Sequence, residues 1–163
     1  MRIRLLAALI LVAAPVAAQQ TVARPAGWRL RYDRPGAADT AMKVAAMGTG
    51  WHVTTSSRGS GIAWRAEQTT RGDFRVVLET SLAPSTGNHL EGYGLFLGGG
   101  DLDSANQNYL YFLIRKDGQF LIKHRAGAET HNILAWTSSP AIIKQEGSAS
   151  ADNTLAVEAS ADS

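Results

Sequence analysis

The chain has 163 residues, no cysteine and a formal net charge of +2. Without cysteine it can form neither disulfides nor thiolate metal sites, and it has no cysteine that could carry a lipid anchor. When Arg2 and Arg4 of the N-terminal segment are set aside, the 16 basic residues fall to 14 and equal the 14 acidic ones. That balance, together with the lack of a basic run, argues against a nucleic-acid partner.

Residues 1–18 have the features of a secretory signal peptide. Arg2 and Arg4 form a basic start, residues 5–14 are apolar, and Val16 and Ala18 are small residues placed before a cleavage site near Gln19. The apolar stretch is shorter than the ~20 residues that a transmembrane helix needs, and no second long one follows. We therefore expect export to the periplasm or the medium, with no membrane contact after cleavage and residues 19–163 forming one domain.

The rest of the chain is typical of short β-strands separated by Gly, Ser, Asn and Asp. The expected strands are residues 28–32, 51–55, 62–65, 74–82, 93–97, 109–115, 119–125, 133–136 and 155–159. The clearest is 74–82, where Phe74, Val76 and Leu78 alternate with outward-facing residues such as Arg75. Only residues 37–46 offer a short helix. Many short strands with turn signals between them predict an all-β, antiparallel sandwich or barrel.

The end of the chain is unusual for such a fold. Residues 154–159 read as a strand, and residues 160–163 read as a turn that leads to no further strand. Proteins usually avoid an open ladder edge at a terminus. We therefore expect the sequence to be truncated at its C-terminus, so that the sandwich lacks its last strand or strands.

The segment Lys116-Asp117-Gly118 predicts a hairpin turn with two possible registers. A two-residue Asp-Gly turn would place Phe112 and Lys123 on the same face. A three-residue loop with Gly118 in the left-handed conformation shifts the pairing by one residue. Because a one-residue slip moves a whole strand to the other face, burial should select the second register, which separates the two faces cleanly.

In that register the hairpin has an apolar face and a mixed face. The apolar face, which we expect in the core, carries Leu110, Phe112, Ile114, Phe120, Ile122 and His124. The mixed face carries Tyr109, Tyr111, Leu113, Arg115, Gln119, Leu121, Lys123 and Arg125. Tyrosine offers a flat ring and a hydroxyl to a sugar, and cations reach hydroxyl or carboxylate groups. The candidate carbohydrate-binding residues are Trp64, Tyr109, Tyr111, Lys123 and Arg125. The alternative is that the long basic stems merely cover the tyrosines.

Three segments resemble a known family. They are YGLFLGG (93–99), YLYFLIRKDGQFLIKHRAG (109–127) and NTLAVEA (153–159). They are similar to the middle of a concanavalin A-like lectin/glucanase jelly roll, in particular the laminin-G-like and 3-keto-disaccharide hydrolase group of secreted bacterial proteins. The resemblance covers the chain from about residue 51 and implies an antiparallel jelly-roll β-sandwich. Members typically continue into a strand that ends in an Asn-Gly turn, which this chain lacks.

Such folds carry lectins, hydrolases and structural modules, so activity has to be read from a site. Glycoside hydrolysis needs two carboxyl groups about 5–10 Å apart. The Glu-x-Asp-x-x-Glu strand of related glucanases is absent, and Glu79 and Glu158 stand alone on their strands. No Gly-x-Ser-x-Gly elbow is present either. We therefore predict no catalytic residues.

Metal sites and cofactors are not predicted. Asp101 and Asp103, with Asn106 and Asn108, offer oxygen ligands that suit calcium, but the EF-hand spacing fails and a polar turn is the alternative. The four histidines, His52, His89, His124 and His131, have no zinc spacing, and His124 is expected in the core. The sequence thus predicts an exported, non-catalytic domain that binds a glycan; its rivals are a disaccharide-processing hydrolase and an envelope protein-interaction module.

Overall fold

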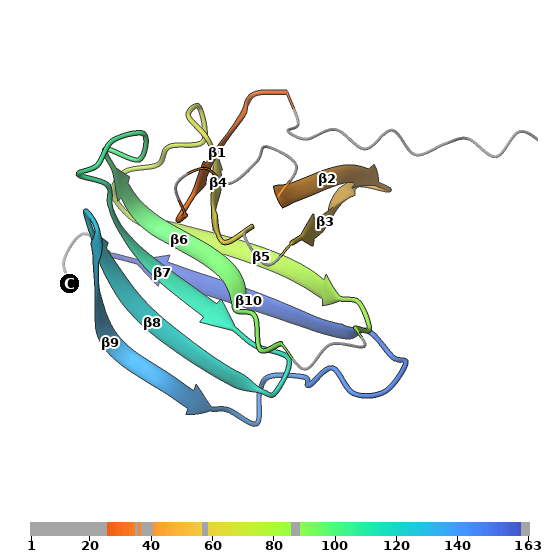
Figure 1. Ribbon diagram of the computed structural model, residues 1–163. Coiled ribbons are helices and arrows are strands. Elements are labelled where there is room, and N and C mark those ends of the chain that lie inside the picture. The colour runs from red at the N-terminus through yellow and green to blue at the C-terminus, as the bar shows by residue number, and fades with distance from the viewer. Residues whose placement is uncertain (1–25, 35, 37–40, 57–58, 86–88, 161–163) are drawn as a thin grey trace, which may run out of the picture. The chain divides into compact units, whose positions relative to one another are not determined.

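The computed structural model describes residues 26–34, 36, 41–56, 59–85 and 89–160, and the predicted signal peptide lies outside them. The described residues form ten β-strands and no α-helix, which confirms the predicted all-β class (Figure 1). All the strand pairs are antiparallel. The chain divides into two compact units, residues 1–66 and 67–163.

The first unit holds two strand pairs. Strand β1 (Trp28–Tyr32) pairs with β4 (Gly61–Arg65), and β2 (Met42–Met47) pairs with β3 (Gly50–Thr55). Gly48 takes a φ of 59° in the β2–β3 turn, which a two-residue hairpin turn requires.

The short helix expected over residues 37–46 is wrong where the structure describes it. Residues 42–46 lie in β2, and residues 37–40 are outside the described part. The tight turn at Gly48 brings β3 alongside, so that Val44 lies opposite Val53 and the backbone groups pair across the ladder instead of within a helix.

The second unit holds a four-stranded and a two-stranded sheet. Strands β6 (Tyr93–Gly100), β7 (Asn108–Ile114), β8 (Gln119–Ala126) and β9 (Glu129–Ser138) follow one another as a curved meander (Figure 1). Strand β5 (Phe74–Leu82) pairs with β10 (Ala151–Ala159). The last strand, expected to have no partner, pairs with β5 over its whole length, from Ala151 opposite Leu82 to Ala159 opposite Phe74.

The core of the second unit lies between these two sheets. Ile114 (2% exposed) of β7 and Leu155 (3%) of β10 are its most buried members, and Leu95 joins them. Partly buried side chains packed against them come from both sheets and from the β9–β10 connection: Val76, Leu78, Tyr93, Leu97, Phe112, Phe120, Ile142 and Val157. Burial alternates strictly along β5, which confirms the period-2 pattern read from the sequence. The unit is therefore sandwich-like.

A buried asparagine fastens the connection between β9 and β10. Asn153 (8% exposed) accepts a hydrogen bond from the Ile143 amide at 2.9 Å and donates one to the Ile143 carbonyl at 3.0 Å. Its own carbonyl accepts a bond from the Thr80 hydroxyl. Burial raises the pKa of the nearby Tyr93 hydroxyl, while hydrogen bonds with Asn153 and Thr80 oppose that rise. The side chain thus satisfies backbone groups that the strand ladders do not reach.

The β8–β9 ladder contains two register shifts, which are β-bulges. Phe120 lies opposite Thr137, Ile122 opposite Leu134, and His124 opposite His131. At each shift one extra residue is inserted in β9. Because two insertions restore the alternation, the two ends of β9 keep the same facing relative to β8.

Candidate functional site

The β7–β8 hairpin takes the second of the two predicted registers. Ile114 lies opposite Phe120 and Leu110 opposite His124. The Arg115 amide donates to the Gln119 carbonyl at 2.9 Å, and Gly118 has a φ of 83°. The left-handed glycine of a three-residue loop is therefore confirmed, and with it the division of the hairpin into two faces.

Four of the five predicted carbohydrate-binding residues share one face of this hairpin. Tyr109 lies opposite Arg125, and Tyr111 opposite Lys123. Tyr109 is only 4% exposed and packs against Phe96 and Tyr111, with ring centroids 5.3 and 5.8 Å away. Its ring is thus closed to a ligand, contrary to the expected accessibility of the whole row.

The other predicted residues are half-buried. Tyr111, Lys123 and Arg125 are each partly covered, and Trp64 is half-buried on β4 in the first unit. The mixed face consequently offers only parts of these side chains to solvent.

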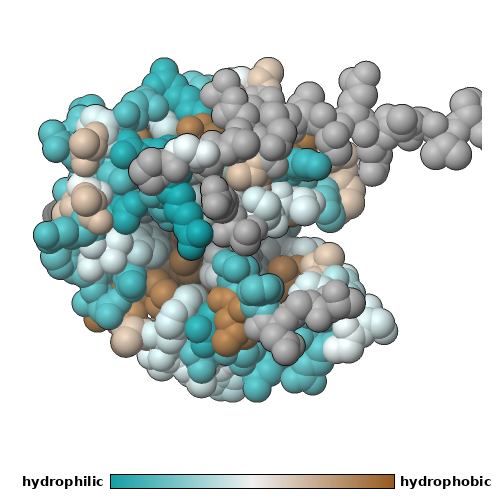
Figure 2. Space-filling model, viewed as in Figure 1, coloured by the Kyte–Doolittle hydropathy of each residue, from teal (hydrophilic) through white to brown (hydrophobic). Residues whose placement is uncertain are grey.

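The opposite face of the same strands is open at one end. Burial along the apolar row falls from Ile114, 2% exposed, to Leu110, 41% exposed. Around Leu110 lies a shallow groove of about 480 Å³. It is lined by Leu97, Gly98, Asn108, Leu110, His124, His131 and Ile133, all in the second unit. In the space-filling view, hydrophobic side chains reach the surface among hydrophilic ones (Figure 2).

Two histidines give this groove its polar side. His124 and His131 lie directly opposite each other on β8 and β9, with ring centroids 6.1 Å apart and ring planes 35° apart. His124 Nε2 lies 2.9 Å from Asn108 Oδ1. His131 Nε2 lies 3.7 Å from Glu129 Oε2. His124 is on the apolar face, as expected, but at its open end and only half-buried.

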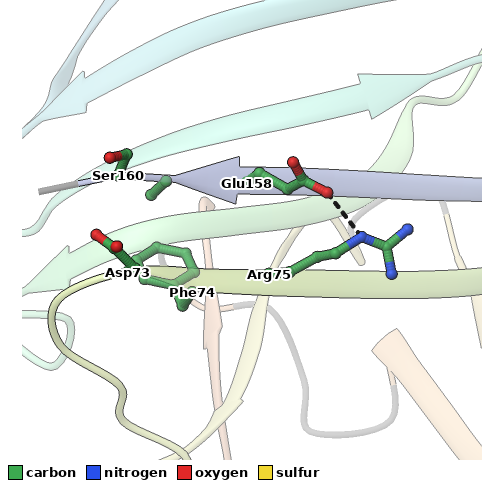
Figure 3. Close-up of a pocket in the computed structure, with 6 residues that line it drawn as sticks. Asp73, Phe74, Arg75, Glu158 and Ser160 are labelled. Atoms are coloured by element: carbon green, nitrogen blue, oxygen red, sulfur yellow. Dashed lines mark hydrogen bonds and ion pairs between the residues drawn. The ribbon is translucent and has the colours of Figure 1, made fainter. Parts of the chain in front are cut away.

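A second pocket, of about 450 Å³, lies where β5 begins and β10 ends. Its lining includes two carboxylates, those of Asp73 and Glu158. Arg75 Nε holds Glu158 Oε1 at 2.9 Å, and both side chains are more than half exposed. Figure 3 shows Asp73 beside Ser160, while Glu158 turns toward Arg75.

The Asp101 loop forms a polar turn. Asp101 has a φ of 51°, and its carbonyl accepts the Ser104 amide at 2.8 Å. The Ser104 hydroxyl in turn accepts the Asn106 amide. These bonds close the turn, and the side chain of Ser104 contributes to it.

Compared with protein-family models, with curated proteins and with solved structures, the chain has no significant match in any of the three. Within the described residues no helix is long and apolar enough to cross a membrane. The site therefore has to be interpreted from its own chemistry.

Proposed function

We propose that this chain is an exported, non-catalytic carbohydrate-binding domain with a concanavalin A-like jelly-roll fold. The single observation that carries the proposal is the groove around Leu110. There an aliphatic floor lies beside one amide and two imidazoles. Carbohydrate sites combine apolar contact with the C–H face of a sugar and a few placed polar groups for its hydroxyls.

The groove offers both kinds of contact. Leu97, Leu110 and Ile133 supply apolar surface, and Ile133 is 59% exposed without a ligand. Asn108 and His124 supply donors and acceptors of fixed orientation, because they already bond each other. The mixed face with Tyr111, Lys123 and Arg125 lies on the other side of the same hairpin, and its buried Tyr109 weighs against it.

Absence of catalysis is proposed from the lining. None of the seven residues around the groove is a carboxylate. The acid and base that glycoside hydrolysis needs are therefore not supplied there. Binding in so shallow a groove covers little of a ligand, so we expect weak affinity that rises with repeated sugar units.

A glycan array with the purified chain tests the proposal. We expect signal on at least one glycan class, and its complete absence would contradict carbohydrate binding. Calorimetry with the best glycan then locates the site. His124→Ala and Leu110→Ser should weaken binding about tenfold or more, a loss of roughly 1.4 kcal/mol.

The matched controls are Tyr111→Ala and Lys123→Ala on the opposite face of the same strands. They should leave affinity within about twofold, since neither side chain lines the groove. The reverse pattern would move the ligand to the mixed face and refute the groove.

One observation favours a second function, that of a hydrolase acting on disaccharides. Asp73 and Glu158 line the same pocket and could serve as the required carboxyl pair. Product release from a panel of disaccharides, including 3-keto-sugars, measures this activity. Turnover that both Asp73→Asn and Glu158→Gln abolish would establish it, and no turnover on any substrate would exclude it for that panel.

A further inference from the structure

We infer that His124 and His131 form a site for a divalent transition-metal ion, Cu(II) foremost and Ni(II) or Zn(II) more weakly. The observation that supports this inference is the position of the two histidines. The register sets them directly opposite each other on adjacent strands, with ring centroids 6.1 Å apart. This inference does not rest on the proposed sugar binding, because a metal ion alone would occupy the site.

The distance suits a shared ion after a small rotation of the side chains. A metal–nitrogen bond of ~2.0–2.1 Å puts each ring centroid about 3 Å from the ion, so two imidazoles on one ion have centroids roughly 5–6 Å apart. His131 has a side chain 56% exposed, and His124 lines the groove, so both rings have room to turn.

The second nitrogen of each ring already faces an oxygen. Asn108 Oδ1 has no proton, so in the 2.9 Å bond His124 Nε2 is the donor, and the neutral ring keeps its lone pair on Nδ1. His131 Nε2 faces the Glu129 carboxylate at 3.7 Å. Within the described part of the chain, no hydrogen bond uses Nδ1 of either ring. Metal-binding histidines are commonly oriented in this way, with an oxygen acceptor fixing the tautomer.

The donor set selects the class of ion. Two neutral imidazoles suit Cu(II), Ni(II) and Zn(II), whereas calcium and magnesium prefer oxygen ligands. Among the described residues, no three His, Asp or Glu side chains converge as a closed metal centre. Water therefore fills the remaining positions, and the ion stays exchangeable. The sequence analysis missed this pair because its predicted strand began at residue 133 and left His131 in a loop, whereas β9 begins at Glu129, directly after a two-residue turn, and so places His131 opposite His124.

Titration of the purified chain with CuCl₂, NiCl₂ and ZnCl₂ in a buffer that does not bind metals tests the inference. Calorimetry should give one site per chain, tightest for Cu(II) in the order expected for nitrogen ligands. The Cu(II) spectrum in electron paramagnetic resonance should show nitrogen coordination. His124→Ala and His131→Ala should each lower affinity at least about tenfold. Unchanged affinity in both variants would overturn the site.

Two further variants separate ligation from folding. His52→Ala, which removes an exposed histidine of β3 in the first unit, should leave affinity unchanged. Asn108→Leu should weaken binding about 10- to 100-fold while Asn108→Asp, which keeps the acceptor oxygen, should restore it. Equal affinity in the Leu and Asp variants would show that Asn108 does not orient His124. If the glycan array gives no signal but the metal binds, only the carbohydrate proposal fails. If a glycan binds but no metal does, only the metal site fails.

Discussion

Arg115 of the β7–β8 turn lies over the ring of Trp136 on β9, with the guanidinium carbon 4.2 Å from the ring centroid. The same guanidinium binds both oxygens of Asp117, at 3.1 Å from Nε and 2.8 Å from an Nη, and it also bonds Gln119 Oε1. Its side chain is only 14% exposed. One side chain thus fixes the turn and joins it to the next strand.

Arg115→Ala should lower the free energy of unfolding by about 1–3 kcal/mol, because it removes a cation–π contact and a bidentate ion pair together. Arg115→Lys should recover less than half of that loss, since an ammonium cannot bind two carboxylate oxygens in parallel while lying flat on an indole. Urea unfolding followed by tryptophan fluorescence measures both. A lysine variant as stable as the parent chain would show that the planar guanidinium group is not required.

The Asp117–Arg115 pair predicts a pH dependence of stability. The hydrogen bond from Arg115 is the main cause that lowers the pKa of Asp117. Since the folded pKa lies below that of the unfolded chain, the pair contributes its full stability above about pH 4 and loses it as the pH falls through the folded pKa. The difference in unfolding free energy between the parent chain and Asp117→Asn should therefore shrink on acidification. A difference that is constant with pH would refute the linkage.

Asn153→Leu should destabilise the second unit by about 1–3 kcal/mol, because it removes both hydrogen bonds that the buried Asn153 side chain makes with the backbone of Ile143. Asn153→Asp keeps the acceptor but loses the donor, so its stability should lie between that of the parent chain and that of the leucine variant. Thermal unfolding gives the ranking. Hydrogen exchange at Ile143 should rise in the leucine variant, and unchanged protection there would show that the amide has another partner.

Substitution by alanine should destabilise the protein at Gly94 but have little effect at Gly100, although both glycines lie on β6. A Cβ at Gly94 would collide with the Phe112 carbonyl and push β6 and β7 apart, at a cost of about 3 kcal/mol. A Cβ at Gly100 would meet only the Asn108 carbonyl, at 4.0 Å, so that change should stay within about 0.5 kcal/mol. The denaturant concentrations at which the two variants are half unfolded test this prediction. Similar losses of stability in both would mean that strand propensity, and not steric contact, sets the effect.

The sequence predicted those features that depend on neighbours along the chain. Alternation gave the clear strand at 74–82, and the glycine that tolerates a left-handed conformation gave the β7–β8 register. The short helix at 37–46 failed in its described part, because the partner strand that competes with local propensity is itself short and lies beyond a turn.

The candidate site was less predictable, because exposure depends on the other sheet. The faces of the hairpin were assigned correctly, yet Tyr109 is buried while Leu110, on the supposed core side, is 41% exposed. Alternation tells which side chains share a face and not how far a second layer covers it. The His124–His131 pair follows from the two-residue turn at Gly127 and Ala128, which the prediction of a strand over 133–136 left inside a longer loop.

The pairing of the histidines depends on the length of the β8–β9 turn and not on the bulges. Gly127 and Ala128 form that turn, and His124 and His131 are the third pair from it, after Ala126 with Glu129 and Arg125 with Thr130. Both extra residues of β9 lie beyond the Lys123–Asn132 pair, so their deletion would leave the two imidazoles opposite each other. The far end of β9, where Trp136 meets Arg115, can therefore change without disturbing either ligand, and the two ends of one strand are separately adjustable.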